Sequence, residues 1–301
     1  MLKEKEWEIE GGKLTYLEGE DGITVTGCKV NASRVAVPDE IGKVPVTRID
    51  RKAFLSRKQL KEIRLPKGLL EIGDWAFAYC SGLTFVWMPR RNLSMGKGVF
   101  KDCQALSGIF PLEGETARDR QCGMLLGSVP MKLETEYLFT PGDVGSGQWL
   151  CAYDAKVHTF LEQPDEDGYS KMVYCGEEDI MSNMDLYLAE RRREKARLCL
   201  LRLINPVGLS ENFRQELEGY LREHTKGCDS QAAWEVVFFE HGSEQEYYEA
   251  FTGAGCVTEE NYDRILSDMG ERYPEMKGFL MRYRSEKMEQ TDFFAALTLD
   301  L

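Results

Sequence analysis

The sequence predicts an α+β protein. It should contain a short solenoid of repeats with an N-terminal β cap, an irregular middle segment and a C-terminal all-α domain of helical hairpins. Two observations carry this prediction: apolar residues recur every 23 residues along 35–112, and the apolar period becomes helical from about 183 onward. We therefore divide the 301 residues into a β-hairpin cap at 1–34, repeats at 35–112, an irregular α/β linker at 113–182 and a helical domain at 183–301.

The 23-residue period holds in four apolar registers at once. These registers are Phe54, Phe77 and Phe100; Ile49, Ile72 and Met95; Leu60, Leu83 and Leu106; and Ile63, Val86 and Ile109. Such a period is typical of stacked supersecondary units that cannot bury their apolar faces alone. Each unit should carry a short strand that ends at a proline, and successive strands should pair in parallel.

Small residues also repeat at this interval. Gly73 and Gly96 each follow the last apolar residue of a return segment, where a positive φ would be tolerated. Cys80 and Cys103 share another repeat position, where a small apolar side chain should pack. The phenylalanine just before each cysteine is expected to point inward from a single helical turn.

The unit from Ile72-Gly73 through Ala76-Phe77 and Cys80 to Met88-Pro89 resembles the BspA-like leucine-rich repeats, whose pattern is I-G-x-x-A-F-x-x-C-x-x-L-x-x-I-x-L-P. Residues 46–90 match it closely, and an imperfect earlier unit at Val35–Pro38 is followed by five extra residues. The resemblance implies a right-handed solenoid used for protein or glycan contact. Many members of that family are surface proteins.

The segment before the repeats has a β-hairpin signal. Trp7 and Ile9, Leu14 and Tyr16, and Ile23 and Val25 alternate, and Gly11-Gly12 separates the first two pairs. These strands should cap the first repeat, because an open solenoid end would expose apolar surface.

Residues 113–182 show no clear repeat, and glycines and prolines such as Gly127 and Pro130 punctuate them. The stretches Trp149–Tyr153, Val157–Leu161 and Met172–Cys175 between these breaks are expected to be strands or short helices.

Six helices are expected after residue 183. The first is long and ends before Pro206, and the other starts are marked by Ser210, Asp229 or Ser230, Ser243, Thr258 and Pro274. Short loops should make neighbouring helices antiparallel. The pairing of Asn261–Ile265 with Phe279–Tyr283 loosely resembles ankyrin-like helical hairpins; an ordinary α-helical domain is the alternative.

Composition and charge narrow the class of protein. A net charge of −13 argues against nucleic-acid binding, and the basic run 191–197 is expected to be a solvated helix face. No apolar window is long enough for a membrane span. The nine scattered cysteines and an N-terminus without a secretory pattern favour a cytoplasmic protein with reduced thiols. Secretion by an unrecognised export route remains an alternative.

No motif assigns catalysis, a metal or a cofactor, and only three histidines are present. His224 and His241 are expected at helix ends. A pairing of His158 with Cys151 or Cys175 would support an alternative function, an enzyme with its active site in 113–182 and repeats that recognise substrate. The acidic cluster 177–179 should either oppose a helix dipole or bind a hard cation, with the structural role favoured.

The candidate binding residues come from strand alternation. Side chains between the inward positions should face outward, which places Arg64, Trp87 and Phe110 in one column and Phe85 in the next. Aromatic and arginine side chains dominate interface hot spots, so this patch predicts a site for a protein partner. The alternative is that residues 113–301 of the same chain cover it. The sequence therefore favours a non-enzymatic protein-interaction scaffold.

Overall fold

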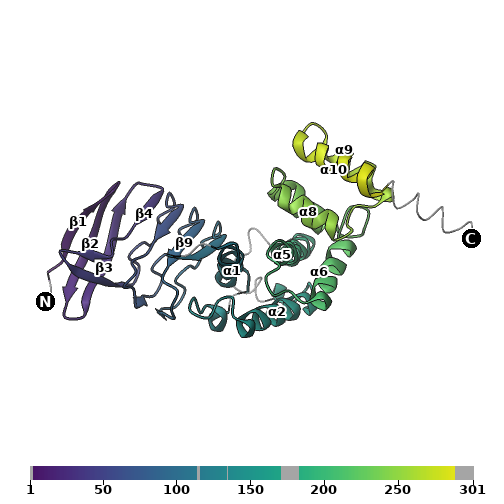
Figure 1. Ribbon diagram of the computed structural model, residues 1–301. Coiled ribbons are helices and arrows are strands. Elements are labelled where there is room, and N and C mark those ends of the chain that lie inside the picture. Colours follow the sequence, from purple (N-terminus) through teal and green to yellow (C-terminus); the bar gives the residue numbers. More distant parts are fainter. Residues whose placement is uncertain (1–2, 114–115, 134, 171–182, 289–301) are drawn as a thin grey trace, which may run out of the picture. The chain divides into compact units, whose positions relative to one another are not determined.

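The computed structural model describes residues 3–113, 116–133, 135–170 and 183–288. The chain divides into two compact units, Met1–His158 and Thr159–Leu301, and each is described by itself. The predicted α+β class is confirmed, with a β-solenoid in the first unit and mostly helices after it (Figure 1). The domain boundaries predicted at 34, 112 and 182 stay predictions.

The strands of the first unit form two sheets. Their bounds are β1 (Lys5–Ile9), β2 (Gly12–Gly19), β3 (Gly22–Val30), β4 (Arg34–Ala36), β5 (Glu40–Ile41), β6 (Val44–Ile49), β7 (Glu62–Arg64), β8 (Glu71–Ile72), β9 (Phe85–Met88), β10 (Ser94–Met95) and β11 (Gly108–Pro111). The larger sheet has the order β1-β2-β3-β6-β8-β10, with β5 beside β6, and the smaller sheet has the order β11-β9-β7-β4.

The N-terminal cap is confirmed. β1 and β2 form an antiparallel hairpin, and β3 pairs antiparallel with β2. On its other edge β3 pairs in parallel with β6, so the cap and the repeats share one sheet. The extra residues of the first repeat form a second hairpin, β5–β6, around Gly42 and Lys43. Both have positive φ, 59° and 70°, as a type I′ turn requires.

The repeats stack as their period predicts. β7, β9 and β11 pair in parallel, with Ile63 opposite Val86 and Val86 opposite Ile109. The ring of Phe77 stacks between two others, 5.0 Å from Phe54 and 5.5 Å from Phe100 between centroids. We call the stacked rings of Phe54, Phe77 and Phe100 the phenylalanine ladder. The repeated cysteines are buried in the predicted way. The thiols of Cys80 and Cys103 donate to the backbone carbonyls of Phe54 and Phe77, respectively, at 3.1 Å.

The predicted reason for the repeated glycines, a positive φ, was wrong. Neither Gly73 nor Gly96 has a positive φ. A Cβ atom on Gly73 would lie 2.6 Å from the Arg51 nitrogen, and one on Gly96 would lie 2.3 Å from the Asp74 nitrogen. Glycine is needed here because the backbones of successive coils touch, and a side chain would push them apart.

The middle segment is more helical than predicted. It contains α1 (Ala117–Ser128), the π-helical turn η1 (Val129–Leu133), the 3-10 turn η2 (Glu136–Leu138) and α2 (Gly147–Glu162), which begins in the first unit and ends in the second. The stretches Trp149–Tyr153 and Val157–Leu161 both lie in α2, so neither is a strand. Gly127, predicted as a break, lies inside α1. Met172–Cys175 is outside the described residues.

The second unit contains the six predicted helices. Their bounds are α5 (Met184–Ile204), α6 (Glu211–Glu223), α7 (Ala232–Glu235) continued by η3 (Val236–Glu240), α8 (Gln245–Gly253), α9 (Glu259–Met269) and α10 (Pro274–Tyr283) continued by η4 (Arg284–Met288). Ser210 accepts the Phe213 N–H as the predicted N-cap, and Thr258 forms a capping box with Asn261. α6, α7 and α8 pack against α5. The ankyrin-like resemblance stays a prediction.

The basic run on α5 is not the solvated face that the sequence predicts. Its side chains are half-buried or buried and pair with carboxylates on neighbouring segments. These pairs are Arg192 and Lys195 with Asp165 (2.8 and 2.7 Å), Arg193 with Glu235 (3.1 Å) and Arg197 with Glu240 (2.7 Å). Carboxylates from other segments of the same unit therefore neutralise the positive charge of this run.

Candidate protein-interaction surface

The outward face of the smaller sheet carries the predicted binding residues in two columns. Strand pairing sets Arg64 opposite Trp87 and Trp87 opposite Phe110 in one column. Phe85 lies between Glu62 and Gly108 in the other. The side chains between these positions point inward, and Ile63, Val86 and Ile109 are almost completely buried. The predicted alternation of the repeat strands therefore holds.

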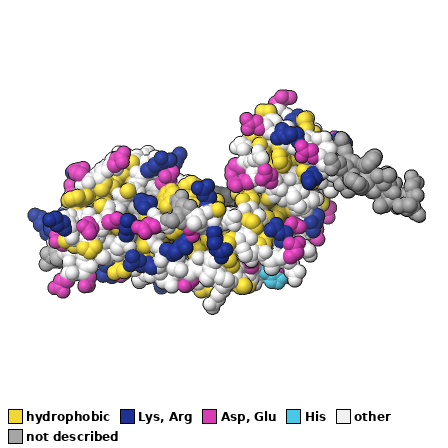
Figure 2. Space-filling model, in the orientation of Figure 1, with side chains coloured by type: hydrophobic (Ala, Val, Ile, Leu, Met, Phe, Trp, Pro, Cys, Tyr) yellow, Lys and Arg dark blue, Asp and Glu magenta, His cyan; other side chains and the backbone are white. Residues whose placement is uncertain are grey.

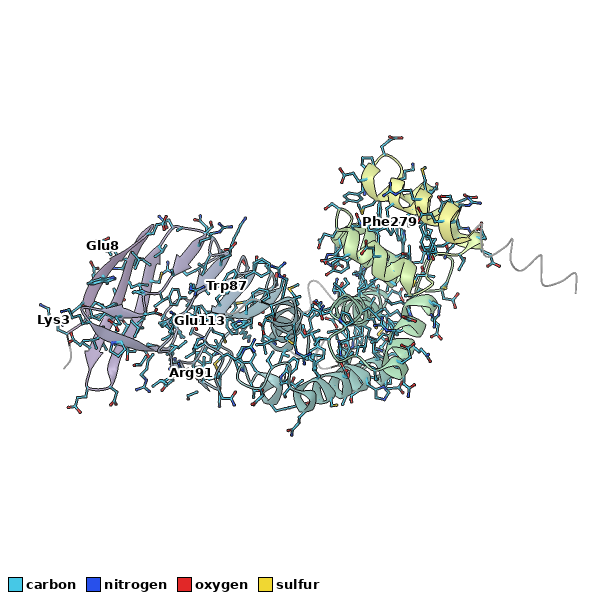
Figure 3. The ribbon with its side chains drawn as sticks, in the orientation of Figure 1. Lys3, Glu8, Trp87, Arg91, Glu113 and Phe279 are labelled. Carbon is cyan, nitrogen blue, oxygen red and sulfur yellow. The ribbon has the colours of Figure 1, made fainter. Side chains whose placement is uncertain are left out.

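The three aromatic rings of this face touch one another. Phe85 lies 6.1 Å from Trp87 and 5.7 Å from Phe110 between ring centroids, and Trp87 lies 5.8 Å from Phe110. Phe85 and Trp87 are half-buried, whereas Phe110 is only 9% exposed. Two of the three rings are therefore partly open to solvent. Trp87 is labelled in Figure 3 on the strand-rich part of the chain before α1.

Helix α1 covers Phe110. A Cβ atom added to Gly123 would lie 2.3 Å from the Phe110 ring, and one added to Gly127 would lie 2.6 Å from the Ser107 carbonyl oxygen. Two glycines four residues apart on one helix face thus let α1 lie directly on β11. Thr116 and Asp119 start the helix with a reciprocal capping box. The same chain therefore covers the patch at Phe110, and its partly open portion consists of Arg64, Phe85 and Trp87.

Arg64 is exposed and spans the strand ends. Its guanidinium donates to the Leu112 carbonyl at 2.9 Å, which holds the side chain across the end of the neighbouring strands. On the same face, in the column of Phe85, Arg34 of the edge strand β4 and Glu62 form an ion pair at 3.1 Å. We name the face made by Arg64, Phe85 and Trp87 the aromatic face. On the side shown in Figure 2, hydrophobic side chains of the first unit lie among charged ones of both signs.

A cavity of about 500 Å³ lies beside the strand ends that Arg64 spans. Its charged lining is arranged in pairs: Lys67 with Glu113 at 3.1 Å, and Arg90 with Asp119. Burial raises the pKa of Asp119, but hydrogen bonds from Arg90 and Thr116 outweigh it, so this pKa lies below its usual value. Arg91 donates to the Lys67 carbonyl at 2.7 Å. The cavity is thus lined by three basic and two acidic side chains, unlike the aromatic face.

The residues weighed for catalysis do not assemble into a site. Cys151 and His158 are both exposed on α2, where seven residues separate them by about 10.5 Å along the helix axis. That spacing is too long for a direct hydrogen bond. Cys175 and the acidic cluster 177–179 lie outside the described residues. His224 and His241 do follow helix ends, where their Nδ1 atoms contact the Tyr220 carbonyl (2.8 Å) and Glu244 (3.0 Å).

The buried thiols are poor nucleophiles. Burial raises the pKa of Cys28 and Cys80 to about 11 and that of Cys103 and Cys256 to about 12. A thiol rather than a thiolate is therefore present at neutral pH, and these cysteines serve packing.

The sequence prediction did not include Gly123 and Gly127, the residues through which α1 covers Phe110. The signal was present as Gly123-x-x-x-Gly127, preceded by the capping pair Thr116 and Asp119. Small residues four apart after a cap favour a helix that packs closely. As one of several glycines and prolines in 113–182, Gly127 instead predicts a break in the chain.

Comparison with known proteins identifies the repeats. Residues 32–116 match the model of the BspA type leucine rich repeat region in six copies. No curated protein matches the chain. No helix within the described residues is long and apolar enough to cross a membrane.

Solved structures of bacterial leucine-rich repeat proteins also match. A T. pallidum leucine rich repeat protein is 26% identical over 36% of this chain and 50% of its own, with a TM-score of 0.27. A leucine-rich repeat protein from Bacteroides capillosus is 24% identical over 38% of this chain and 91% of its own, with a TM-score of 0.30. A leucine rich cell surface protein from Faecalibacterium prausnitzii is 20% identical over 36% and 30%, with a TM-score of 0.29.

This chain thus spans half the length of the T. pallidum protein and less than a third of the F. prausnitzii one. The 23-residue registers, the parallel strands and the family match all coincide on the same segment. Residues 32–116 are accordingly a BspA-type leucine-rich repeat region, and this part of the chain belongs to that repeat family.

Proposed function

We propose that the protein is a non-enzymatic interaction scaffold that binds a protein partner through the aromatic face. One observation carries the proposal: the ring centroids of Phe85 and Trp87 lie 6.1 Å apart, and both side chains are partly open to solvent beside the exposed Arg64. Leucine-rich repeat domains generally mediate protein interactions. A partner that covers these two rings would remove apolar surface from water and leave the arginine to make directional hydrogen bonds.

The face is suited to binding because it is already ordered. Phe85 and Trp87 stand on β9, which is paired on both sides, and Arg64 is held by the Leu112 carbonyl. Little side-chain entropy remains to be lost when a partner binds, which favours affinity. The charged pair Arg34–Glu62 at the sheet margin would help orient the partner without contributing much to affinity.

A three-bait affinity experiment tests the aromatic face. The baits are the full chain, the double variant Arg64→Ala/Trp87→Ala, and the control Leu70→Ala, which changes a side chain 52% exposed. We expect a protein that is captured by the first and third baits and lost from the second. An identical set of captured proteins on all three baits would contradict the proposal.

A stability measurement accompanies the capture experiment. Because Trp87 is only half-buried, Trp87→Ala should lower the free energy of unfolding by about 1–2 kcal/mol. A loss above about 4 kcal/mol would make Trp87 a core residue and remove the support for the binding face.

We also propose that the protein works in the cytoplasm. The support is the state of the cysteines: none of the eight in the described residues forms a disulfide, and six of them are buried. Fractionation of the native cell followed by immunoblotting tests this, and recovery in the medium or at the cell surface would contradict it.

A further inference from the structure

The inference concerns a second surface, at the end of the solenoid where the repeats stop. In each coil, three backbone N–H groups two residues apart donate to carbonyls of the next coil. The donors Lys52, Phe54 and Ser56 bind carbonyls of 74, 76 and 78 at 2.8–3.0 Å, and the donors Trp75, Phe77 and Tyr79 bind carbonyls of 97, 99 and 101 at 2.8–2.9 Å. We call each set of three a donor row.

The donor rows depend on an unusual backbone. The first and third residues of each row have positive φ: 61° and 58° at Lys52 and Ser56, and 53° and 60° at Trp75 and Tyr79. The hydrogen bonds of each row show that its three N–H groups all point along the stack toward the next coil. Each coil therefore offers donors to whatever lies next along the stack.

The last coil repeats this conformation, but the described residues supply no acceptors for the N–H groups of its donor row. Gly98 and Asp102 have φ values of 57° and 55°, in register with the rows before them. Across the described residues, no hydrogen-bond acceptor is found for the N–H groups of Gly98, Phe100 and Asp102. β10, the strand of this coil in the larger sheet, likewise has β8 as its one strand partner in the described part of the chain.

The chain changes course where the next coil would be. A fourth ladder phenylalanine would fall at position 123, which is Gly123 in α1. Phe139 from beyond η2 instead meets the ladder, with its ring 5.8 Å from that of Phe100. The replacement is incomplete, because a cavity of about 560 Å³ remains between the last coil and the η1–η2 segment.

The cavity combines apolar walls with unused polar groups. Its apolar lining includes Met95, Val99, Phe100, Met131 and Phe139. The three residues of the last donor row also line it, together with Thr135, whose buried hydroxyl has no hydrogen-bond partner in the described residues. We name this cavity the end groove.

We propose that the end groove binds an extended segment of a partner polypeptide. Alternate backbone carbonyls of that segment accept hydrogen bonds from Gly98, Phe100 and Asp102, and an apolar side chain fills the space between Phe100, Met131 and Phe139. The occupant is identified by the chain itself, because both earlier donor rows are satisfied by carbonyls of a polypeptide backbone. Strand addition to an open sheet edge uses the same principle.

Two other occupants fit the groups less well. A small anion would find one basic and one acidic residue in the lining, Lys101 and Asp102, so the side chains supply no net positive charge to hold it. A second copy in a symmetric pair would set donor rows against each other, since a two-fold axis brings identical surfaces together. A polypeptide with alternating apolar residues satisfies both the donors and the walls.

Amide hydrogen exchange on the full chain tests the first step. At low protein concentration the N–H groups of Gly98, Phe100 and Asp102 should exchange at least about a hundredfold faster than those of Trp75, Phe77 and Tyr79, since only the latter have acceptors. Equal protection of the two rows would mean that the chain itself covers the last row, and would overturn the proposal. Protection that increases with protein concentration would assign the groove to a second copy and would also overturn it.

A random peptide library displayed on phage and selected on the full chain tests the second step. Selected peptides should slow exchange at Gly98, Phe100 and Asp102 by about tenfold or more. They should lose at least about tenfold in affinity for Met131→Trp, which fills the groove, and none for Met281→Trp, a matched change at an exposed methionine of α10.

Peptides that bind both methionine variants equally would overturn the proposal. Because the aromatic face is a separate surface, peptides of the end groove should also bind Arg64→Ala/Trp87→Ala unchanged. Peptides lost from that variant instead would support the aromatic face and contradict the end groove. Slower exchange of Gly98, Phe100 and Asp102 in the presence of selected peptides needs no variant, so it tests the proposal even where Met131→Trp fails to fold.

Discussion

Each coil of the repeats is held to the next by stacked rings and backbone hydrogen bonds, whereas the helical unit ties its central helix to neighbouring segments through ion pairs. In the first case the buried contacts are apolar or neutral, as between Phe77 and its two neighbours, and the ion pair Arg34–Glu62 between coils lies at the surface. In the second, Asp165 receives both Arg192 and Lys195 on α5. The difference teaches that a damaged repeat should disturb the adjacent coils, while a charge change should disturb the helical unit.

The largest expected effect is in the phenylalanine ladder. Phe77→Ala removes a fully buried ring from between two others and should lower the free energy of unfolding of the first unit by about 3–5 kcal/mol. Hydrogen exchange followed by mass spectrometry reports the two units separately and should show loss of protection in the repeats alone. Phe239→Ala is the control, because that ring is 65% exposed and its removal should cost under about 0.5 kcal/mol. Equal losses of unfolding free energy in the two variants would show that the stacked rings do not stabilise the repeats.

The next effect is in the helical unit. Asp165→Ala leaves Lys195, whose side chain is 4% exposed, with the Gln163 carbonyl but without its carboxylate. Such a loss should cost about 2–3 kcal/mol, somewhat below the value for a fully buried pair because Asp165 is 18% exposed. Asp263→Ala removes an acid that is 87% exposed, and should cost under about 0.5 kcal/mol. If urea unfolding finds the two variants alike, the ion pairs do not support the unit.

A smaller effect is expected where coils touch. Gly96→Ala places a methyl group 2.3 Å from the Asp74 nitrogen, which requires the coils to separate and should cost about 1–3 kcal/mol. Gly253→Ala, at the end of α8, meets no atom within 4 Å and should stabilise the helical unit slightly. Thermal unfolding of both variants checks the signs. A neutral Gly96→Ala would show that the coils are not in contact.

The sequence predicts the repeats well because every coil repeats the same solution. Ile63, Val86 and Ile109 could be assigned to the core from their spacing alone, since a 23-residue period leaves one packing arrangement for all units. The helix starts at Ser210 and Thr258 were equally readable, because both residues act through bonds to residues three positions away, whereas the N-caps of α7 and α8 are Gln231 and Glu244 rather than the predicted residues. Local rules and a repeated pattern were enough for these elements.

The candidate site was only partly predictable, because what covers a surface is decided by residues far along the chain. Alternation placed Arg64, Phe85, Trp87 and Phe110 on one face, but the burial of Phe110 depends on Gly123 and Gly127 fitting against β11. The end groove was missed altogether. Its N–H donors lack acceptors because α1 replaces the coil that would have supplied them. Residue spacing does not reveal this replacement, since it depends on how distant segments pack.

The smallest effect is the pH dependence of the helical unit. Burial works to raise the pKa of Asp165 and Glu190, but hydrogen bonds and charges from their basic partners outweigh it, so both pKa values lie below the usual ones. An acid with a lowered pKa contributes stability that is complete above its unfolded pKa, near 4, and is lost as pH falls through the folded value. Burial raises the pKa of Glu194, which acts in the opposite sense and offsets part of this loss. The urea midpoint of the helical unit should therefore fall as the pH drops below about 5. Glu190→Gln should make that fall shallower, and an unchanged slope would show that the pairs on α5 do not couple folding to protons.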